Sequence, residues 1–547
     1  MAADKIRRKV RVLDTSNQTS LFAETEPAEG ARATEAEPLS TPVARFEAPD
    51  PRSIFINRVR LDEHLKSVEL KTPLRIRPLL DKLSFAEFEA GYRPVGRPPY
   101  APRAMVGLIL YGIMQGISSL RELERCARSD VGCWWLSGGI MPDHSVIGRF
   151  VRQHEALLTA EFFEQLTRQV LKVTGSGTAV VAGDGTVIEA MSSRFRLVRE
   201  EALNAAWVEA REAAEAGPDR EQARERLAQL EQAQRQLQER QAKQTAKGKD
   251  PAKTQIHPLE PDAVVQPQKN SKDFRPSYKP SVLANEVRVI LACEVHPSSE
   301  TEPVAGLLAR AKALGDVDTA LFDSGYFSEG VIRTMDDQAM ELLCPEGQSL
   351  GDDWNKHSDK QFPKSRFEYL PEKDAYRCPN QQMLTPCGHY RGSATAPAYT
   401  EYGTTACADC PLKPPCTRRE TGRKIKRYGI DDAKDALRAK LGLEEHRQRY
   451  RRRQGMVEPV FSQLRGQQGL RRFRRRGLAG VRVEFALHAM AYNLSRAMAL
   501  ATLWACWSGW WARLRKSRFD FDGFEHIFEA VLFSPGWPFW LPQKPVF

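Results

Sequence analysis

The spacing of hydrophobic residues changes along the chain and divides it into regions. From Ile54 to Lys172 apolar residues recur every three to four positions, which predicts a helical region. Thr178–Ala190 and Tyr278–Val295 instead contain short, valine-rich apolar runs, which are typical of buried strands. Further strands are predicted over Thr319–Phe322 and Glu341–Cys344, and helices over Glu302–Leu314, Glu329–Gln338 and Val481–Leu500. Strands that alternate with helices predict an α/β domain over residues 173–500.

The helical region contains two short helices, the second with a clear start signal. One is predicted over Ser119–Arg128, and the other, Val146–Gln153, follows the turn and N-cap Pro142–Ser145. Two short helices joined by a capped turn are typical of a helix-turn-helix, although an ordinary helical bundle gives the same pattern. We therefore expect an all-α N-terminal DNA-binding domain over residues 54–172, with phosphate contacts from Arg149, Arg152 and His154.

Two insertions interrupt the α/β pattern. Residues 199–270 predict a charged helical hairpin with a turn at Gly217–Asp219, followed by a linker. A narrow leucine seam, Leu227–Leu237, indicates a solvated arm, and a dimer or DNA contact is the alternative. Residues 345–440 are rich in proline, glycine and cysteine and have no long period, so this second insertion lacks the pattern of a large hydrophobic core.

The two ends of the chain differ in composition from its middle. Residues 1–53 are rich in Ala, Glu, Thr and Pro, which predicts a disordered segment, and the aromatic-rich residues 501–547 are expected to pack as a tail on the preceding domain. Polar residues interrupt the apolar run Phe485–Trp511, so we interpret it as a buried helix and not as a membrane span. Met1–Val10 is charged and lacks the apolar core of a signal peptide, which favours a cytoplasmic location and reduced thiols.

The charge of the chain favours nucleic acid as a partner. The net charge is +11 over 547 residues, and the sequence pI is about 9.1. Between Arg447 and Arg476 the chain has eleven arginines and a single acid, Glu458. A field of one sign indicates a polyanion. We expect DNA contacts from this stretch at Arg453, Arg465, Arg471, Arg472, Arg474, Arg475 and Arg476, with the last five positioning the DNA backbone.

One candidate carboxylate lies inside a predicted strand. Asp184 is near the centre of Thr178–Ala190, and burying an aspartate is costly unless it binds a metal or another partner. Gly183 and Gly185 on either side would leave room for a ligand next to the carboxylate. A turn at this Gly-Asp-Gly sequence is the alternative.

Two further carboxylates lie at the ends of predicted elements. Asp323 follows the strand Thr319–Phe322, where α/β enzymes commonly carry ligand residues. Glu458 stands beside apolar residues, and the next residue, Pro459, is typical of the first turn of a helix, so we expect Glu458 near a helix start. A simple salt bridge with a neighbouring arginine is the alternative for Glu458.

Taken together, the three acids and the arginines predict a metal site that acts on a polyanion. Oxygen ligands of this kind select Mg²⁺ or Mn²⁺. Two such ions about 3.5–4 Å apart can activate water and stabilise the leaving oxygen at phosphorus. Without metal, Asp184, Asp323 and Glu458 would repel a phosphate. We therefore predict that the acids hold the metal ions and the arginines hold the nucleic-acid backbone.

The cysteines predict a second kind of site. Of ten cysteines, five fall between Cys378 and Cys416, and Cys407-Ala-Asp-Cys410 has the spacing of a metal knuckle. One structural zinc on Cys378, Cys407, Cys410 and Cys416 would fold an insertion that has little core. Reduced free thiols, or a redox or iron–sulfur site, are the alternatives.

These residues also carry a family resemblance. Asp184 in GDGT, Asp323 in DSGYF and Glu458 in YRRRQGMVEPVFSQLR resemble the DDE transposases of bacterial insertion sequences. GRPPYAPRAMVGLILYGIMQGISSLRELERCARSD, WWLSGGIMPDHSVIGRFVR and RRFRRRGLAGVRVEFALHAMAYNLSRAM resemble one subgroup, the eleven-eighty-two group. The resemblance covers about Ile54 to Met498 and extends to the cysteine insertion. Arg465 stands where members of the family usually carry lysine.

The resemblance implies a fold, an activity and partners. It implies an RNase-H-like DDE catalytic domain over residues 173–500 and cleavage of element ends followed by strand transfer into target DNA. The expected partner is double-stranded DNA, bound by a homodimer or higher oligomer associated with the bacterial nucleoid. Two alternatives remain: a metal-dependent nuclease without strand transfer, and a DNA-binding regulator whose acids are vestigial.

Overall fold

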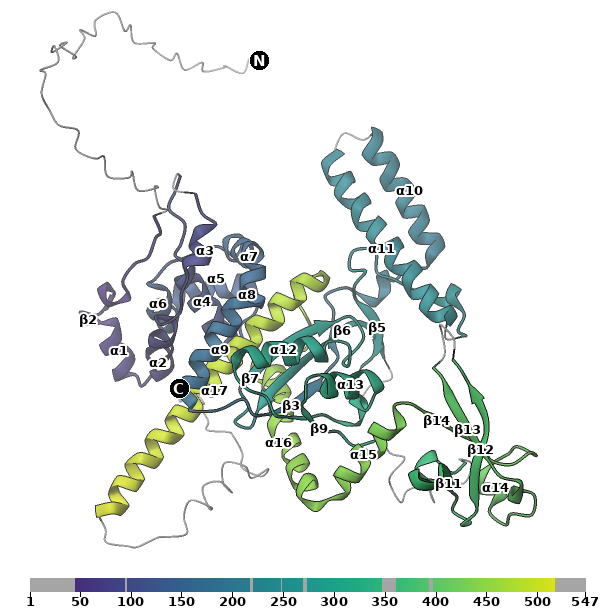
Figure 1. Cartoon of the computed structure of the whole chain (residues 1–547). Coiled ribbons are helices and arrows are strands. Elements are labelled where there is room, and N and C mark those ends of the chain that lie inside the picture. Colours follow the sequence, from purple (N-terminus) through teal and green to yellow (C-terminus); the bar gives the residue numbers. More distant parts are fainter. Residues whose placement is uncertain are drawn as a thin grey trace, which may run out of the picture. The chain divides into compact units, whose positions relative to one another are not determined.

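The computed structural model describes residues 45–516, except positions 94–95, 217–219, 247, 269–272, 347–360 and 393–396 (Figure 1). The predicted disordered segment 1–53 therefore lies outside the described residues up to position 44. Its last part differs from the prediction, because Pro51–Ser53 forms a 3₁₀ turn and Glu47 forms a β-bridge with Tyr100. Residues 517–547 of the expected aromatic tail also lie outside the described residues.

The N-terminal region is helical apart from a small hairpin of the two-residue strands β1 and β2. Helix α4 forms its centre, because its apolar sequence is buried on all sides except at Arg103. The bounds are β1 (Phe55–Ile56), β2 (Val59–Arg60), α1 (Leu61–Ser67), α2 (Lys71–Leu80), α3 (Ala86–Ala90), α4 (Pro102–Met114), α5 (Leu120–Ser129), α6 (Val131–Ser137), α7 (His144–Gln153), α8 (Glu155–Thr159) and α9 (Glu161–Thr174).

The two short helices expected in this region are present as α5 and α7, and they pack against each other. The backbone N–H groups of Ser145 and Val146 donate to the carboxylate of Asp143 at 2.8 Å, which confirms the predicted N-cap of α7. The prediction of one turn between them is wrong, because helix α6 lies between them in the sequence. Asp130 caps α6 and Gly138 ends it with a positive φ of 78°.

The α/β region contains a mixed sheet around the long strand β6. β6 is antiparallel to β3 and β7, and β8 is parallel to both β3 and β9, which gives the order β7–β6–β3–β8–β9. The short strands β4 and β5 pair with the first residues of β6. The bounds are β3 (Val180–Gly185), β4 (Ile188–Glu189), β5 (Val264–Pro267), β6 (Phe274–Asn285), β7 (Ile290–His296), β8 (Thr319–Leu321) and β9 (Glu341–Leu343).

The predicted strand Thr178–Ala190 is two strands, β3 and β4, and the partner strand explains the break. Thr186 follows β3 and lies opposite Pro280 of β6. The backbone N–H of Thr186 donates to the carbonyl of Pro280 at 2.9 Å, but a proline nitrogen has no hydrogen to return the second bond of the pair. The ladder therefore stops directly after Asp184 and Gly185.

The helices of this region match most of the expected positions. They are α12 (Val304–Leu314), α13 (Glu329–Asp337), α15 (Asp431–Gly442), α16 (Glu444–Gly466) and α17 (Gly477–Lys516). α16 packs on β3 and β6, whereas α17 packs on β7 and on the N-terminal helices α4, α8 and α9. α17 begins before and ends after the predicted Val481–Leu500. In the part of the chain that the structure describes, no helix is long and apolar enough to cross a membrane.

The prediction that Glu458 lies near a helix start is wrong. α16 begins at Glu444, so both Glu458 and Pro459 lie well inside it. A proline inside a helix leaves the carbonyl four residues earlier without its usual N–H donor. Here the Arg288 side chain supplies the missing bond, because its Nε donates to the carbonyl of Gly455 at 2.8 Å. A contact from a distant part of the chain thus keeps α16 continuous.

Both insertions form units with small cores of their own. The hairpin consists of α10 (Glu200–Ala216) and α11 (Arg220–Ala246), which lie side by side in Figure 1, and Leu230 and Leu237 of the predicted seam are buried with Leu203. Its predicted turn at 217–219 lies outside the described residues. The cysteine-rich insertion contains a five-stranded antiparallel sheet that the sequence pattern did not reveal: β10 (Glu368–Leu370), β11 (Ala375–Arg377), β12 (Met383–Tyr390), β13 (Tyr399–Gly403) and β14 (Ile425–Tyr428), with the short helix α14 (Lys413–Cys416).

Candidate active site at the ends of two parallel strands

Asp184 and Asp323 lie at the same level on neighbouring parallel strands. Ala182 of β3 pairs with Leu321 of β8, and each aspartate follows two residues later. Asp184 is therefore the second-last residue of β3 and lies beside Asp323, which is the second residue after β8. Two carboxylates 139 residues apart in the sequence thus meet at one edge of the sheet (323 − 184 = 139).

Arg453 of α16 joins these two carboxylates. Its Nη2 lies 3.1 Å from Oδ1 of Asp184 and 3.7 Å from Oδ2 of Asp323, and it also donates to the carbonyl of Gly183 at 3.1 Å. The Arg453 side chain is buried. A buried guanidinium between two acids is the expected way to offset their mutual repulsion. The role of Arg453 in the described structure is therefore that of a counter-ion to the acids.

The carboxyl group of Asp184 loses its proton at a higher pH than an ordinary aspartate does. Burial raises the pKa of Asp184 to about 6, the Arg453 cation opposes this rise, and the carboxylates of Asp323 and Glu300 add to it. Glu300, which follows β7, forms an ion pair with Lys279 at 3.1 Å. The site thus brings the carboxylates of Asp184, Asp323 and Glu300 near one another, and carboxylate oxygens are the ligands that hard divalent cations prefer.

The glycines around Asp184 have a different role from the predicted one. A Cβ on Gly183 would lie 2.0 Å from the ring of Phe322, and a Cβ on Gly185 would lie 2.5 Å from the side chain of Glu300. The space at both positions is therefore filled by side chains of the protein and is not left for a ligand. The glycines allow Phe322 and Glu300 to approach the backbone next to Asp184.

Glu458 lies on the same helix as Arg453 but does not join the pair of aspartates directly. Its side chain is exposed, and Nε2 of Gln454 donates to its Oε2 at 3.1 Å. Among the described residues, Asp184, Asp323 and Glu458 do not form a group whose ligand oxygens all lie within 4.8 Å of one another. The exposed carboxylate of Glu458 would therefore have to approach the aspartates to share a ligand with them.

Arg465 and the basic segment 471–476 make several contacts within the protein. Arg465 donates to the Thr186 hydroxyl and, at 3.1 Å, to the carbonyl of Val187, so it fixes the connection between β3 and β4. Arg472 donates to the carbonyls of Ala190 and Met191, and Nε of Arg474 donates to the Ser118 hydroxyl at 2.9 Å. The side chains of Arg471, Arg472, Arg474 and Arg476 are nevertheless exposed.

Glu484 of α17 holds the backbone of the basic segment. The N–H of Arg474 donates to both of its oxygens at 3.0 Å, and the N–H of Arg475 donates at 2.9 Å. Burial raises the pKa of Glu484 to about 7, and the two backbone bonds act in the opposite direction. Neither Glu484 nor Glu300 had a signal in the sequence, because single acids in a helix or a loop are common.

Of the three residues of the N-terminal region that were predicted to contact phosphate, two are exposed and one is buried. Arg149 and Arg152 are exposed on α7. His154 is buried against Phe88 and Phe150, and its Nε2 lies 3.0 Å from the Tyr92 hydroxyl. The prediction of a phosphate contact from His154 is therefore wrong, because the ring belongs to an aromatic cluster of the core.

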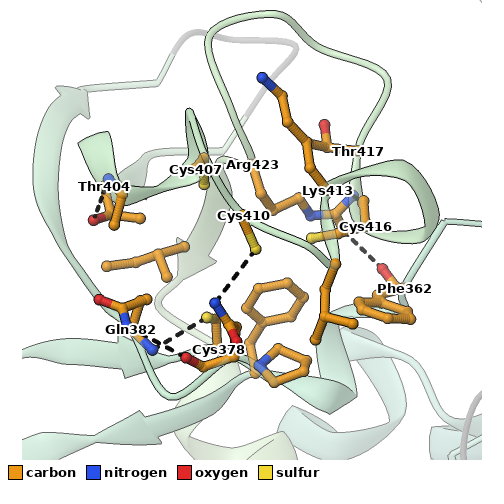
Figure 2. A pocket seen from close by; sticks show the side chains of 16 residues that line it. Phe362, Cys378, Gln382, Thr404, Cys407, Cys410, Lys413, Cys416, Thr417 and Arg423 are labelled. Atoms are coloured by element: carbon orange, nitrogen blue, oxygen red, sulfur yellow. Dashed lines mark hydrogen bonds between the residues drawn. The ribbon is translucent and has the colours of Figure 1, made fainter.

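The four cysteines predicted to bind zinc line one pocket of the cysteine-rich insertion (Figure 2), together with Arg423 and Lys413. A different cluster, Cys126, Asp130 and Cys133, lies in the N-terminal helices and has ligand atoms within 4.8 Å of one another in the described chain. The two thiols of this cluster are buried, and their sulfurs lie 2.9 Å apart.

The fold and the site together define a mixed α/β protein with paired carboxylates next to an arginine-rich helix. Residues 377–498 match the family described as Transposase DDE domain, and residues 63–153 match the family described as Transposase domain (DUF772). These two matches indicate a transposase and confirm the resemblance to the DDE transposases of insertion sequences. No curated protein matches the chain. The first match includes Glu458 but begins after Asp184 and Asp323, so the roles of these two residues rest on geometry.

Proposed function

We propose that this protein binds the ends of an insertion sequence, cleaves the DNA there and transfers the strands into target DNA. The main support is the pair Asp184 and Asp323, which lie at matching positions along the adjacent parallel strands β3 and β8, with Arg453 of α16 next to both carboxylates. The strand order β7–β6–β3–β8–β9 and the family match support an RNase-H-like catalytic domain. The partner is double-stranded DNA, held by a homodimer or higher oligomer.

The side chains at the site fit divalent cations, Mg²⁺ or Mn²⁺, as hard-oxygen ligands. Asp184, Asp323 and Glu458 would hold them, with Glu458 turning from Gln454 toward the strand ends. When bound, two such ions supply Lewis-acid activation of the attacking oxygen and stabilise the leaving oxygen. Arg453 would then move from its position between the aspartates, or remain next to them as a counter-ion to the DNA phosphate.

DNA binding would rest on exposed arginines at two places. Arg149 and Arg152 on α7 belong to the region that matches a transposase domain, and we propose that this region recognises the element ends. The exposed side chains of the basic segment 471–476 would contact the DNA backbone. Because α17 packs on the N-terminal helices, end recognition has to be measured on the full chain. A gel-shift experiment with random duplex as competitor measures whether the chain prefers the element ends over other DNA.

A cleavage experiment tests the chemistry. The full chain is incubated with Mg²⁺ and DNA that carries the element ends, and cleaved and joined products are mapped. Asp184→Asn, Asp323→Asn and Glu458→Gln keep side-chain size but lose charge, so each should abolish both products while end binding remains. Asp318→Asn, at the opposite end of β8, is the matched control and should retain activity. Cleavage without joined products would leave a nuclease, and near-normal cleavage by any of the three variants would remove that residue from the site.

A further inference from the structure

The cysteine-rich insertion has a core that is small for its length. Residues 361–430 bury six hydrophobic side chains in one cluster: Phe362, Phe367, Tyr376, Leu384, Tyr402 and Ile425. Cys378 and Cys416 are partly buried and pack against this cluster. Small units of this kind usually need a metal or a covalent link in addition to their core. The loops that carry the cysteines are therefore expected to need a further stabilising interaction.

Four of the cysteines come from separate places in the insertion and line the same pocket (Figure 2). Cys378 follows β11, Cys407 ends a 3₁₀ turn, Cys410 lies in the loop after it, and Cys416 ends α14. The four cysteines thus line one enclosed space although the sequence separates them by up to 38 positions (416 − 378).

The surroundings of the thiols suit thiolates. The backbone N–H of Gln382 donates to Sγ of Cys378 at 3.3 Å, and Nδ2 of Asn380 donates to Sγ of Cys410 at 3.5 Å. The Arg423 guanidinium lines the same pocket, and its buried Nε has no hydrogen-bond partner among the described residues. Donors to sulfur and a nearby cation are typical of the shell around metal thiolates.

The backbone also approaches one of the cysteines closely. Gly422 has a φ of +91°, and a Cβ at this position would lie 2.6 Å from Cβ of Cys407 and 3.0 Å from its Sγ. Only glycine accepts both this conformation and this contact. The loop that carries Arg423 is therefore pressed against the thiol of Cys407, which encloses the pocket on that side.

We propose that Cys378, Cys407, Cys410 and Cys416 bind one zinc ion as thiolates and that this ion holds the loops of the insertion together. Each thiol releases its proton to solvent on binding. Zinc with four thiolates carries two net negative charges, which Arg423 and Lys413 at the pocket offset. Tetrahedral Zn–S bonds of about 2.3 Å place the sulfurs roughly 3.8 Å apart. Among the described residues no three of the four sulfurs lie within 4.8 Å of one another, so the loops would have to move together on binding the ion. The site is independent of the proposed function, since it would be equally present in an inactive chain.

The insertion contains a matched control. Cys387 lies on β12, is exposed and is absent from the lining of the pocket. The full chain purified without chelator should contain about one zinc per chain. Cys387→Ser should retain this zinc, whereas Cys378→Ser, Cys407→Ser, Cys410→Ser and Cys416→Ser should each lose most of it. Replacement by Co²⁺ should give the sulfur-to-metal absorption of tetrahedral thiolate coordination, which is weakened in each of the four variants.

A second measurement covers variants that do not fold. In the zinc-loaded natural chain, alkylation followed by mass spectrometry should label Cys387 quickly and the four pocket thiols slowly, and a chelator should remove this difference. The proposal is overturned if soluble chain incubated with Zn²⁺ holds none, or if the four thiols react as fast as Cys387. It is also overturned if all four serine variants keep zinc that Cys126→Ser or Cys133→Ser removes.

Discussion

At the scale of single residues, the ionisation of Asp184 should govern the affinity for metal. Burial raises the pKa of Asp184 to about 6 from an ordinary value of 3.8. Between these two values the folded chain keeps a proton that the unfolded chain has lost, so the contribution of Asp184 to stability falls as the pH rises through this window. Binding of a divalent cation requires the ionised form and therefore has the opposite dependence.

We accordingly expect Mn²⁺ to bind about tenfold more weakly for each pH unit below pH 6. Titration of the full chain with Mn²⁺, followed by electron paramagnetic resonance, measures this dependence. Asp184→Asn removes the titrating group, so any Mn²⁺ affinity that this variant retains should no longer change with pH near pH 6. If the step persists in the variant, another acid causes it.

The acids were predictable from the sequence because each had a local signal. An aspartate inside an apolar strand, or directly after one, is costly and therefore informative, and the structure brings Asp184 and Asp323 together. The surroundings of Glu458 were not predictable. Pro459 indicated a helix start, but Arg288 satisfies the carbonyl of Gly455 and lets the helix continue through the proline. The sequence cannot show that contact, because the two residues are separated by 167 positions.

At the scale of elements, Glu484 determines the position of the basic segment 471–476. It accepts the backbone N–H groups of Arg474 and Arg475, and Glu484→Ala leaves these donors without a protein partner. A loosened segment should hold the DNA backbone less well. We expect weaker binding to every DNA sequence alike, and a salt dependence that is flatter by roughly one to two phosphate contacts. Fluorescence anisotropy over a range of salt concentrations measures both effects.

Glu484→Gln keeps one acceptor oxygen and provides the graded comparison. Its effect on DNA affinity should lie between those of the natural residue and alanine. Equal binding by the alanine variant and the natural chain would show that the arginines act without a fixed backbone. A loss confined to the element ends would show that the segment reads bases.

At the scale of the whole molecule, α17 connects the N-terminal helices to the sheet through Asn493. Its side-chain oxygen accepts a hydrogen bond from the N–H of Ile290 in β7 at 2.8 Å. Its side-chain nitrogen donates to the carbonyl of Ile290 at 2.8 Å and to the Thr167 hydroxyl of α9 at 3.3 Å. All of these groups are buried. Asn493→Ala leaves the N–H and the carbonyl of Ile290 unsatisfied, which should cost about 1–3 kcal/mol.

Hydrogen exchange on the full chain should therefore show faster exchange in both α9 and β7 for Asn493→Ala. Ser495→Ala is the matched control on the same helix, because in the described part of the chain the Ser495 hydroxyl donates to the carbonyl of Ala491 in α17 and to no other element. Faster exchange limited to one of the two elements would show that the asparagine does not couple them.

The position of α17 also affects how the chain folds as it is made. α4 is buried on almost all sides, and part of that cover is α17, which follows it by more than 300 residues. At about 5–20 residues per second, the ribosome releases α17 roughly tens of seconds after α4. During that time the nascent chain exposes an apolar surface that chaperones can bind. A product that terminates early never covers this surface, so only chains translated through α17 can complete the N-terminal region.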